Sequence, residues 1–428
     1  MIENTSKVLG PKWTYNLFRL IRTLYSILDF ISTTVFGYSL IHGRIEKEKN
    51  AQLSGHLVKI LGRCTDCPAS QVFLDRNFIL QHHSYVDPID FVIHNDFVTL
   101  MGANKTHAWF CVSPHFDVYD SSIIPFAFLA QYLNAQKLLI VDHATLHQIA
   151  EKLHLRGKCI MINNTARCGS TLLCQIFKKL PKTVVQSEPW SLLYIHRLYN
   201  QREICWAEYQ MLIESFIKMQ FKPTVDKSTD LYVIKLPFLC AAMFNPIKTI
   251  FGDQIRFLFS VRHLKPSITS FVKILKSLDP KDWLDKDRFW TENIGFPYQE
   301  KYRPMYKKYH AQRKTLTDVQ KVTLASGAAL INFRENLEMY DFVAVYEEMM
   351  GNVSEKVTQM FEAFEIPKIH VNECIKVLDT HSQKKMFEGR HQVEEIDAHE
   401  WKKADRILEE FQLPFKIRMS TDQFIASI

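Results

Sequence analysis

The segment 157–177, GKCIMINNTARCGSTLLCQIF, contains the residue types needed to hold an anion. An apolar run leads into a short polar loop with one glycine, Gly169, and a helix is expected to begin at Ser170 and Thr171. Free amides at a helix N-terminus, two hydroxyl groups and the charge of Arg167 would then surround one anion. The lysine that follows the second glycine of an ATPase phosphate loop is missing, which favours a cradle without an obligatory metal ion. A strand–turn–helix without a ligand is the alternative for this segment alone.

A second segment, 257–271 (FLFSVRHLKPSITSF), offers an independent anion site. Arg262 ends an apolar run, Pro266 is expected to start a helix, and Ser270 follows in its first turns. A guanidinium at a strand end can grip a phosphate through two parallel hydrogen bonds, and a nearby hydroxyl can share the same phosphate. An Arg–Ser pair alone is more often structural, so the pair becomes a candidate site through its combination with the first segment.

Together the two segments resemble the sulfotransferase family that uses 3′-phosphoadenosine-5′-phosphosulfate (PAPS). The resemblance covers roughly residues 157 to 390 and implies a P-loop-NTPase-like sulfotransferase fold. It implies that Arg262 and Ser270, with the family's eight-residue spacing, bind the 3′-phosphate of the nucleotide. The family's loop for the 5′-phosphosulfate is matched by Arg167, Cys168, Gly169, Ser170, Thr171 and Leu172.

Further positions resemble the protein-tyrosine and related Golgi-type branch of that family. Glu188 stands where the branch has a catalytic base and Lys235 where it has a strand lysine, so the resemblance implies catalysis by Glu188, Lys235 and Arg167 without a metal. DFVAVYEEMMGN resembles the family's strand that ends in Tyr-Glu-Asp-Leu. LDTHSQKKMFEGR resembles the loop that closes over the nucleotide, with Ser382 and Gln383 matched best.

Two departures from the family's usual pattern leave the chemical class of the acceptor undetermined. His263-Leu264 follows the second arginine where the family usually has Asp or Asn and then Pro. The Lys-Ser-Gly-Thr-Thr-Trp loop and catalytic histidine of the small-molecule branch cannot be placed, with His196 and His263 only as reserve bases. The acceptor is therefore a small molecule, a glycan or a protein side chain. A catalytically inactive nucleotide-binding relative and a phosphate-loop kinase remain the alternative functions.

The elements around these residues predict an α/β fold, a parallel central sheet with helices on both faces. Ligands in such sheets bind beyond the carboxyl ends of the strands, where both motifs stand. Apolar runs predict strands at 159–163, 231–235, 254–261 and 341–346. Periodic or proline-led segments predict helices at 170–180, 266–275, 320–337 and 355–365.

Residues 1–150 differ in pattern and are expected to form an α+β extension before a sulfotransferase-like domain at 151–428. Strands are predicted at 71–74, 77–81, 97–101, 109–112 and 138–141, with a helix at 122–134. The stretch Leu24–Ile41 is mostly apolar at helical spacing but contains Asp29. Three placements stay open: against the protein's own surface, at a membrane surface through residues 13–43, or across a membrane.

The composition of the chain limits its possible binding partners and its cellular compartment. The net charge of +7 favours anionic ligands, but no Lys/Arg block or RNA-binding motif is present, so no nucleic acid partner is expected. Nine cysteines lie without regular spacing, several within apolar runs, which indicates buried thiols in a reducing compartment. With no evident signal peptide, the sequence predicts a cytoplasmic protein, membrane-associated if the apolar stretch contacts lipid.

Overall fold

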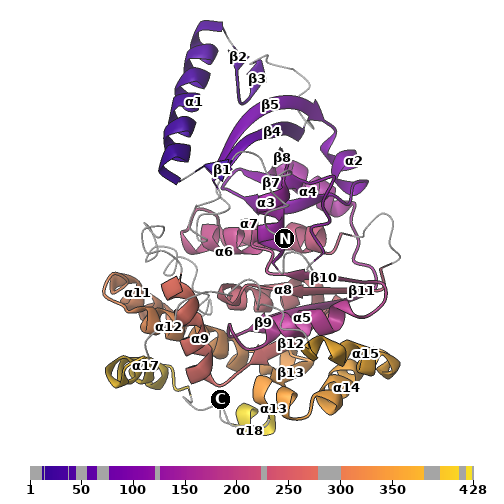
Figure 1. The fold of residues 1–428 in the computed structure, drawn as a ribbon, viewed down its shortest axis with the longest axis vertical. Coiled ribbons are helices and arrows are strands. Elements are labelled where there is room, and N and C mark those ends of the chain that lie inside the picture. The colour runs from indigo at the N-terminus through magenta and orange to yellow at the C-terminus, as the bar shows by residue number, and fades with distance from the viewer. Residues whose placement is uncertain are drawn as a thin grey trace. The chain divides into compact units, whose positions relative to one another are not determined.

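A computed structural model describes residues 12–13, 15–36, 38–44, 55–64, 77–120, 126–222, 229–277, 300–379, 396–413 and 421–426. The chain divides into two compact units (Figure 1). The first unit comprises Met1–His154 and Glu203–Lys227, and the second comprises Leu155–Arg202 and Ser228–Ile428. The segment 203–227 thus belongs to the first unit, although it lies beyond the boundary expected at residue 150.

The second unit is built on a five-stranded sheet in which every neighbouring pair of strands is parallel. The sequence is therefore correct in predicting an α/β protein with a parallel sheet. Strand β9 lies between β11 on one side and β12 on the other, so the chain order reverses there, and such a point marks the usual ligand crevice. The order is β10 (Thr183–Ser187), β11 (Leu231–Lys235), β9 (Lys158–Asn164), β12 (Ile255–Val261) and β13 (Phe342–Val345).

Alternate side chains of β12 pack against different helices. Leu258 belongs to a buried cluster that includes Phe177 of α5 and Phe361 of α14. Phe259 stacks on Phe333 of α12 with ring centroids 4.1 Å apart, since successive strand residues point to opposite sides. The helices of this unit are α5 (Ser170–Lys178), α6 (Ser191–Asn200), α8 (Phe244–Phe251), α9 (Leu264–Ser277), α11 (Arg303–Ala311), α12 (Asp318–Arg334), α13 (Tyr346–Gly351), α14 (Val353–Ala363), α15 (Val371–Ile375), α17 (Ala398–Glu410) and α18 (Thr421–Ile425).

The first unit contains a six-stranded sheet in which only the β1–β4 pair is parallel among the described strands. Its longest strand, β4, was not predicted, because Lys59, Gly62 and Arg63 interrupt the apolar pattern. Its pairing with β5 is also irregular between Ile60 and Gly62. The strand expected at 71–74 lies outside the described residues. The strands are β1 (Lys12–Trp13), β4 (Gly55–Cys64), β5 (Phe78–Val86), β6 (Val98–Ala103), β7 (His107–Val112) and β8 (Lys137–Asp142), with helices α2 (Pro88–Ile93), α3 (Ala127–Asn134), α4 (His143–Glu151) and α7 (Trp206–Gln220).

Lys222, just beyond α7, is one of the contacts that join segment 203–227 to the rest of the first unit. Its ammonium group donates hydrogen bonds to the carbonyl oxygens of Val92 at 2.8 Å, Asn95 at 2.7 Å and Val98 at 2.7 Å. The side chain is buried, and this burial lowers the pKa of Lys222 to about 8. The end of α7 is thereby attached to the turn between α2 and β6.

Helix α1 (Tyr15–Phe36) begins before the predicted apolar stretch at Leu24 and ends within it. Its residues Phe18, Ile21 and Tyr25 pack against Leu61, Cys64 and Ile79 of the first unit's sheet. A two-stranded hairpin, β2 (Tyr38–Ser39) and β3 (Gly43–Arg44), follows the helix. Within the described ranges, no helix combines the length and apolar character needed to cross a membrane.

Candidate functional site

The loop between β9 and α5 is held rigidly by its neighbours. Ala166 and Arg167 have positive φ angles of 62° and 48°. The amide of Ala166 donates to Asn164 Oδ1 at 3.1 Å, and its carbonyl accepts from Ser267 Oγ of α9 at 2.6 Å. No side chain caps α5, the amide of Leu172 donates to the carbonyl of Gly169 at 2.8 Å, and the amides of a helix's first turn point outward from its N-terminus. The loop therefore presents the amide-rich end of α5 for an anion.

Gly169 is required for two separate reasons. Its φ of 85° lies in the left-handed region, which a residue with a Cβ adopts only at a cost. A Cβ at this position would lie 2.5 Å from Cδ2 of Tyr346, the first residue of α13. The tyrosine ring therefore packs directly on the glycine, and the loop and α13 share one contact.

The two anion-binding segments expected from the sequence meet here. Arg167 Nε donates to Ser270 Oγ of α9 at 3.0 Å. The guanidinium of Arg262 lies over the ring of Tyr346, 4.5 Å from its centroid, so Arg262 and Gly169 contact the same tyrosine. Burial lowers the pKa of Arg167, Arg262 lowers it further, and Glu188 opposes both effects. Two neighbouring guanidinium groups repel each other, and an anion between them would relieve that repulsion.

Arg262 has a donor that no group among the described residues satisfies. Its Nε is buried and has no hydrogen-bond partner in the described part of the chain. The nearest carboxylate oxygen, Glu347 Oε1, lies 3.6 Å from this nitrogen, beyond hydrogen-bonding distance. A buried donor without an acceptor costs about 1–3 kcal/mol. An oxygen-rich anion bound beside Arg262 would supply the missing acceptor.

Lys235 and Glu188 lie at the carboxyl ends of neighbouring strands. Ser187 and Lys235 are paired in the sheet, and the amide of Glu188 donates to the carbonyl of Lys235 at 2.7 Å. The Lys235 ammonium lies 2.6 Å from Glu188 Oε1 and 3.2 Å from Thr171 Oγ1. The lysine side chain is 2% exposed and that of Glu188 is 24% exposed. Lys235 thus links the solvent-accessible carboxylate of Glu188 to Thr171. Thr171 belongs to the segment Arg167–Leu172, which we call the anion loop.

Several other sequence-based expectations have different outcomes. Ser382 and Gln383 lie outside the described residues. His196 is fully buried, which lowers its pKa to about 3, and its Nε2 lies 3.0 Å from Asn200 Nδ2, so it packs as a core histidine. Tyr346 and Glu347 lie in the segment DFVAVYEEMMGN, which the resemblance singled out without a role for either residue, and both contact Arg262. Their position directly after an apolar strand was the signal that could have identified them.

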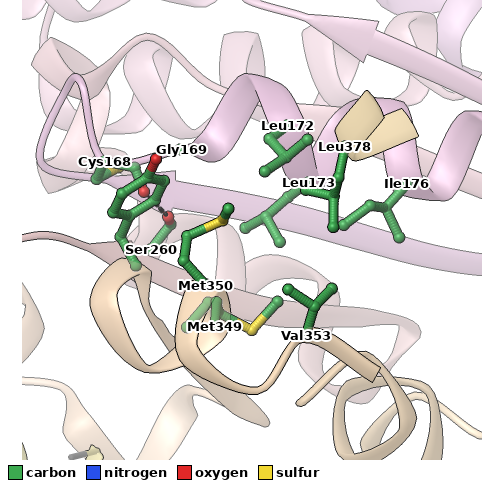
Figure 2. A pocket seen from close by; sticks show the side chains of 12 residues that line it. Cys168, Gly169, Leu172, Leu173, Ile176, Ser260, Met349, Met350, Val353 and Leu378 are labelled. Atoms are coloured by element: carbon green, nitrogen blue, oxygen red, sulfur yellow. Dashed lines mark hydrogen bonds between the residues drawn. The ribbon is translucent and has the colours of Figure 1, made fainter. Parts of the chain in front are cut away.

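A small apolar cavity lies between α5 and α13 beside Gly169 (Figure 2). Its volume of about 20 Å³ is close to that of one water molecule. Its wall includes Leu172, Ile176 and Met349, so it is a packing gap below the loop and no nucleotide pocket. Among the described residues, no group of three or more His, Cys, Asp or Glu side chains could hold a metal ion.

Comparison with known proteins gives no match to a family model or to a curated sequence. Three similar solved structures are all sulfotransferases. The sulfotransferase domain of the Synechococcus PCC 7002 olefin synthase has 11% identity and a TM-score of 0.33, covering 60% of this chain and 96% of that one. Mouse sulfotransferase SULT7A1 complexed with PAP has 11% identity and a TM-score of 0.34, with coverages of 65% and 91%. STF9 from Mycobacterium avium has 13% identity and a TM-score of 0.34, with coverages of 63% and 80%. Structural similarity at such low TM-scores does not assign a function, so the function must be argued from the geometry of the site.

Proposed function

We propose that the second unit is a PAPS-dependent sulfotransferase that transfers a sulfuryl group to a hydroxyl or amine of an acceptor. The observation that carries the proposal is that Arg167, which bonds Ser270, and Arg262, whose stacking partner Tyr346 packs on Gly169, converge beside the N-terminus of α5. A nucleotide with charged groups at both its 5′ and 3′ positions has the charge distribution that such a site requires. The fold implied by the resemblance, a parallel sheet with helices on both faces, is part of this proposal.

The binding roles follow from the residues at each strand end. The loop Arg167–Leu172 and the first turn of α5 would hold the 5′ phosphosulfate through amides, hydroxyls and one guanidinium. Arg262, with its unsatisfied Nε, and Ser270 would hold the 3′-phosphate. Ser382 and Gln383 would close over the nucleotide by the same resemblance. PAPS, once bound, supplies the sulfuryl group and departs as adenosine 3′,5′-bisphosphate.

Arg167 and Lys235 are placed to stabilise negative charge beside the anion loop. Lys235 already donates to Thr171 in the first turn of α5, so its charge is held at the end of the nucleotide where the leaving oxygen would form. Groups fixed in place before the reaction stabilise developing charge without the cost of reorganisation. The burial of Lys235 strengthens this effect because water screens it little.

Glu188 is the proposed general base. Its Oε1 lies 2.6 Å from the Lys235 ammonium, and a carboxylate can accept a proton from the acceptor hydroxyl or amine. Its partial exposure leaves it open to an acceptor, whereas His196 is sealed in the core. The lysine also orients the carboxylate, so base and anion loop are connected through one side chain.

A ligand-binding series tests the proposal. Adenosine 3′,5′-bisphosphate should raise the melting temperature of the protein, whereas AMP and Mg-ATP should raise it little. Transfer of labelled sulfate from PAPS to a panel of phenols, glycans and tyrosine peptides then tests catalysis. Stabilisation by the bisphosphate without transfer to any acceptor would favour a catalytically inactive relative. Stabilisation by Mg-ATP alone would favour a kinase and reject the proposal.

A further inference from the structure

Helix α1 packs one apolar side against the first unit's sheet and leaves a second apolar face exposed. Its polar residues Arg22 and Ser26 border a cavity of about 420 Å³ inside the first unit, whose wall also includes His56, His107 and Asp142. Its aliphatic residues follow the helical spacing of one continuous face and are between 45% and 64% exposed. These residues are Leu17, Leu20, Leu24, Ile27, Leu28, Ile31 and Val35.

The exposed aliphatic face is distinct from the side of α1 that contacts the first unit's sheet through Phe18, Ile21 and Tyr25. Figure 1 shows α1 as the indigo helix at the rim of that unit. Phe30 and Phe36 are further exposed apolar residues of α1, with exposures of 70% and 76%. Apolar surface on this scale, concentrated on one helix, indicates that the helix binds an apolar partner.

The polar groups of α1 are satisfied in ways that suit an apolar environment. The hydroxyls of Thr23, Ser26, Thr33 and Thr34 each donate to the carbonyl four residues earlier, at 2.8–3.0 Å. The carboxylate of Asp29 accepts from Ser39 Oγ at 2.9 Å and from the amide of Ile41 at 3.1 Å. These bonds lower the cost of moving the helix out of water, because few of its donors and acceptors depend on water.

We propose that α1 lies in the plane of an anionic lipid surface and inserts its aliphatic face below the headgroups. The helix does not have the apolar character of a membrane-spanning segment, and an aliphatic face with a polar opposite side is typical of an interfacial helix. Residues 1–50 carry seven Lys or Arg and four Asp or Glu, so their charge complements anionic headgroups.

The same face fits a second copy of the chain less well. Leu17, Leu20, Leu24, Ile27 and Ile31 have the alternating spacing of a coiled-coil seam. The positions that flank such a seam, where charged residues normally select the partner, are Ile21, Thr23, Leu28, Phe30 and Val35. Because none of these flanking residues is charged, nothing in them would select a partner helix, and the wide apolar face suits the interior of a lipid bilayer better than a two-helix interface.

Vesicle co-sedimentation of the full chain tests the proposal. The wild-type protein should bind vesicles of phosphatidylcholine with about one-third phosphatidylserine, and bind pure phosphatidylcholine vesicles more weakly. The Leu24→Glu/Leu28→Glu variant should bind the anionic vesicles about 10- to 100-fold more weakly, because two leucines no longer enter the bilayer. A Leu24→Gln/Leu28→Gln variant should show the same direction of change without adding charge repulsion.

Met211→Glu is the matched control, because Met211 of α7 and Leu24 are both 52% exposed and lie in the same unit. This control should bind vesicles as the wild type does, and unchanged circular dichroism should verify that every variant is folded. Wild-type protein that binds neither vesicle, or α1 variants that bind as the wild type does, would overturn the proposal. So would a dimer that the α1 variants dissociate while vesicles are not bound, since the partner would then be a second copy.

Discussion

Arg167 and Ser270, 103 residues apart in the chain, are joined by a hydrogen bond of 3.0 Å between Nε and Oγ. The bond connects the loop after β9 to the helix after β12, two strands that are neighbours in the sheet. It therefore brings the two segments with anion-binding residue types to one edge of the sheet.

The Arg262→Ala variant should lose affinity for adenosine 3′,5′-bisphosphate by about 1.5–3 kcal/mol, the scale of a charged hydrogen bond. Affinity for AMP, which lacks the 3′-phosphate, should change little. Isothermal titration calorimetry with both ligands measures the difference. Arg262→Lys is the matched variant, because it keeps the positive charge but replaces the planar guanidinium, which can make two parallel hydrogen bonds, with an ammonium group. Equal losses for both nucleotides would show that Arg262 only supports the fold.

The Glu188→Gln variant should reduce turnover about 10²–10⁴-fold, because the amide cannot accept the acceptor's proton. Binding of adenosine 3′,5′-bisphosphate should remain close to that of the wild type. The assay is the steady-state rate of sulfate transfer to the acceptor found for the wild type. Glu409→Gln, at an exposed position of α17, controls for the substitution itself. Unchanged turnover in Glu188→Gln would remove this residue from the mechanism.

The Gly169→Ala variant should have a free energy of unfolding about 2–4 kcal/mol lower than the wild type. The alanine must keep a positive φ, and its Cβ must displace the Tyr346 ring. Urea denaturation followed by circular dichroism measures this free energy. Gly351→Ala is the control, since a Cβ there would meet nothing within 4 Å. Its helical position favours alanine, so the control should be neutral or slightly stabilised. Equal stability of the two variants would contradict the contact described between Gly169 and Tyr346.

The Lys222→Met variant should destabilise the first unit by about 2–4 kcal/mol, because three buried carbonyls lose their shared donor. Lys218→Met, four residues earlier in α7, removes one pairing with Glu214 and should cost little. Thermal unfolding of both variants gives the comparison. A Lys222→Met protein as stable as Lys218→Met would show that other contacts, and not this ammonium group, hold α7 in the first unit.

Local pattern predicted many elements of the second unit. The apolar run at 231–235 coincides with β11, and the run at 254–261 differs from β12 by one residue. Helix α9 begins at Leu264, two residues before Pro266, because proline is tolerated in the first turn of a helix. Strand β10 was missed because Thr183–Ser187 is short and mixes polar with apolar residues. In the first unit, the polar and glycine residues of β4 concealed a ten-residue strand.

The sequence by itself determined which residue types stand at the strand ends, and these types predicted an anion site at Arg167 and Arg262. Only the tertiary structure decided which of them meet: Lys235 with Glu188, Arg167 with Ser270, and Arg262 with Tyr346. The physical reason is that hydrophobic periodicity reports on a few neighbouring residues, whereas these contacts depend on strand order and register across the sheet. For the same reason, the spacing of apolar residues in α1 predicted a helix, and only packing against the sheet decided which side faces outward.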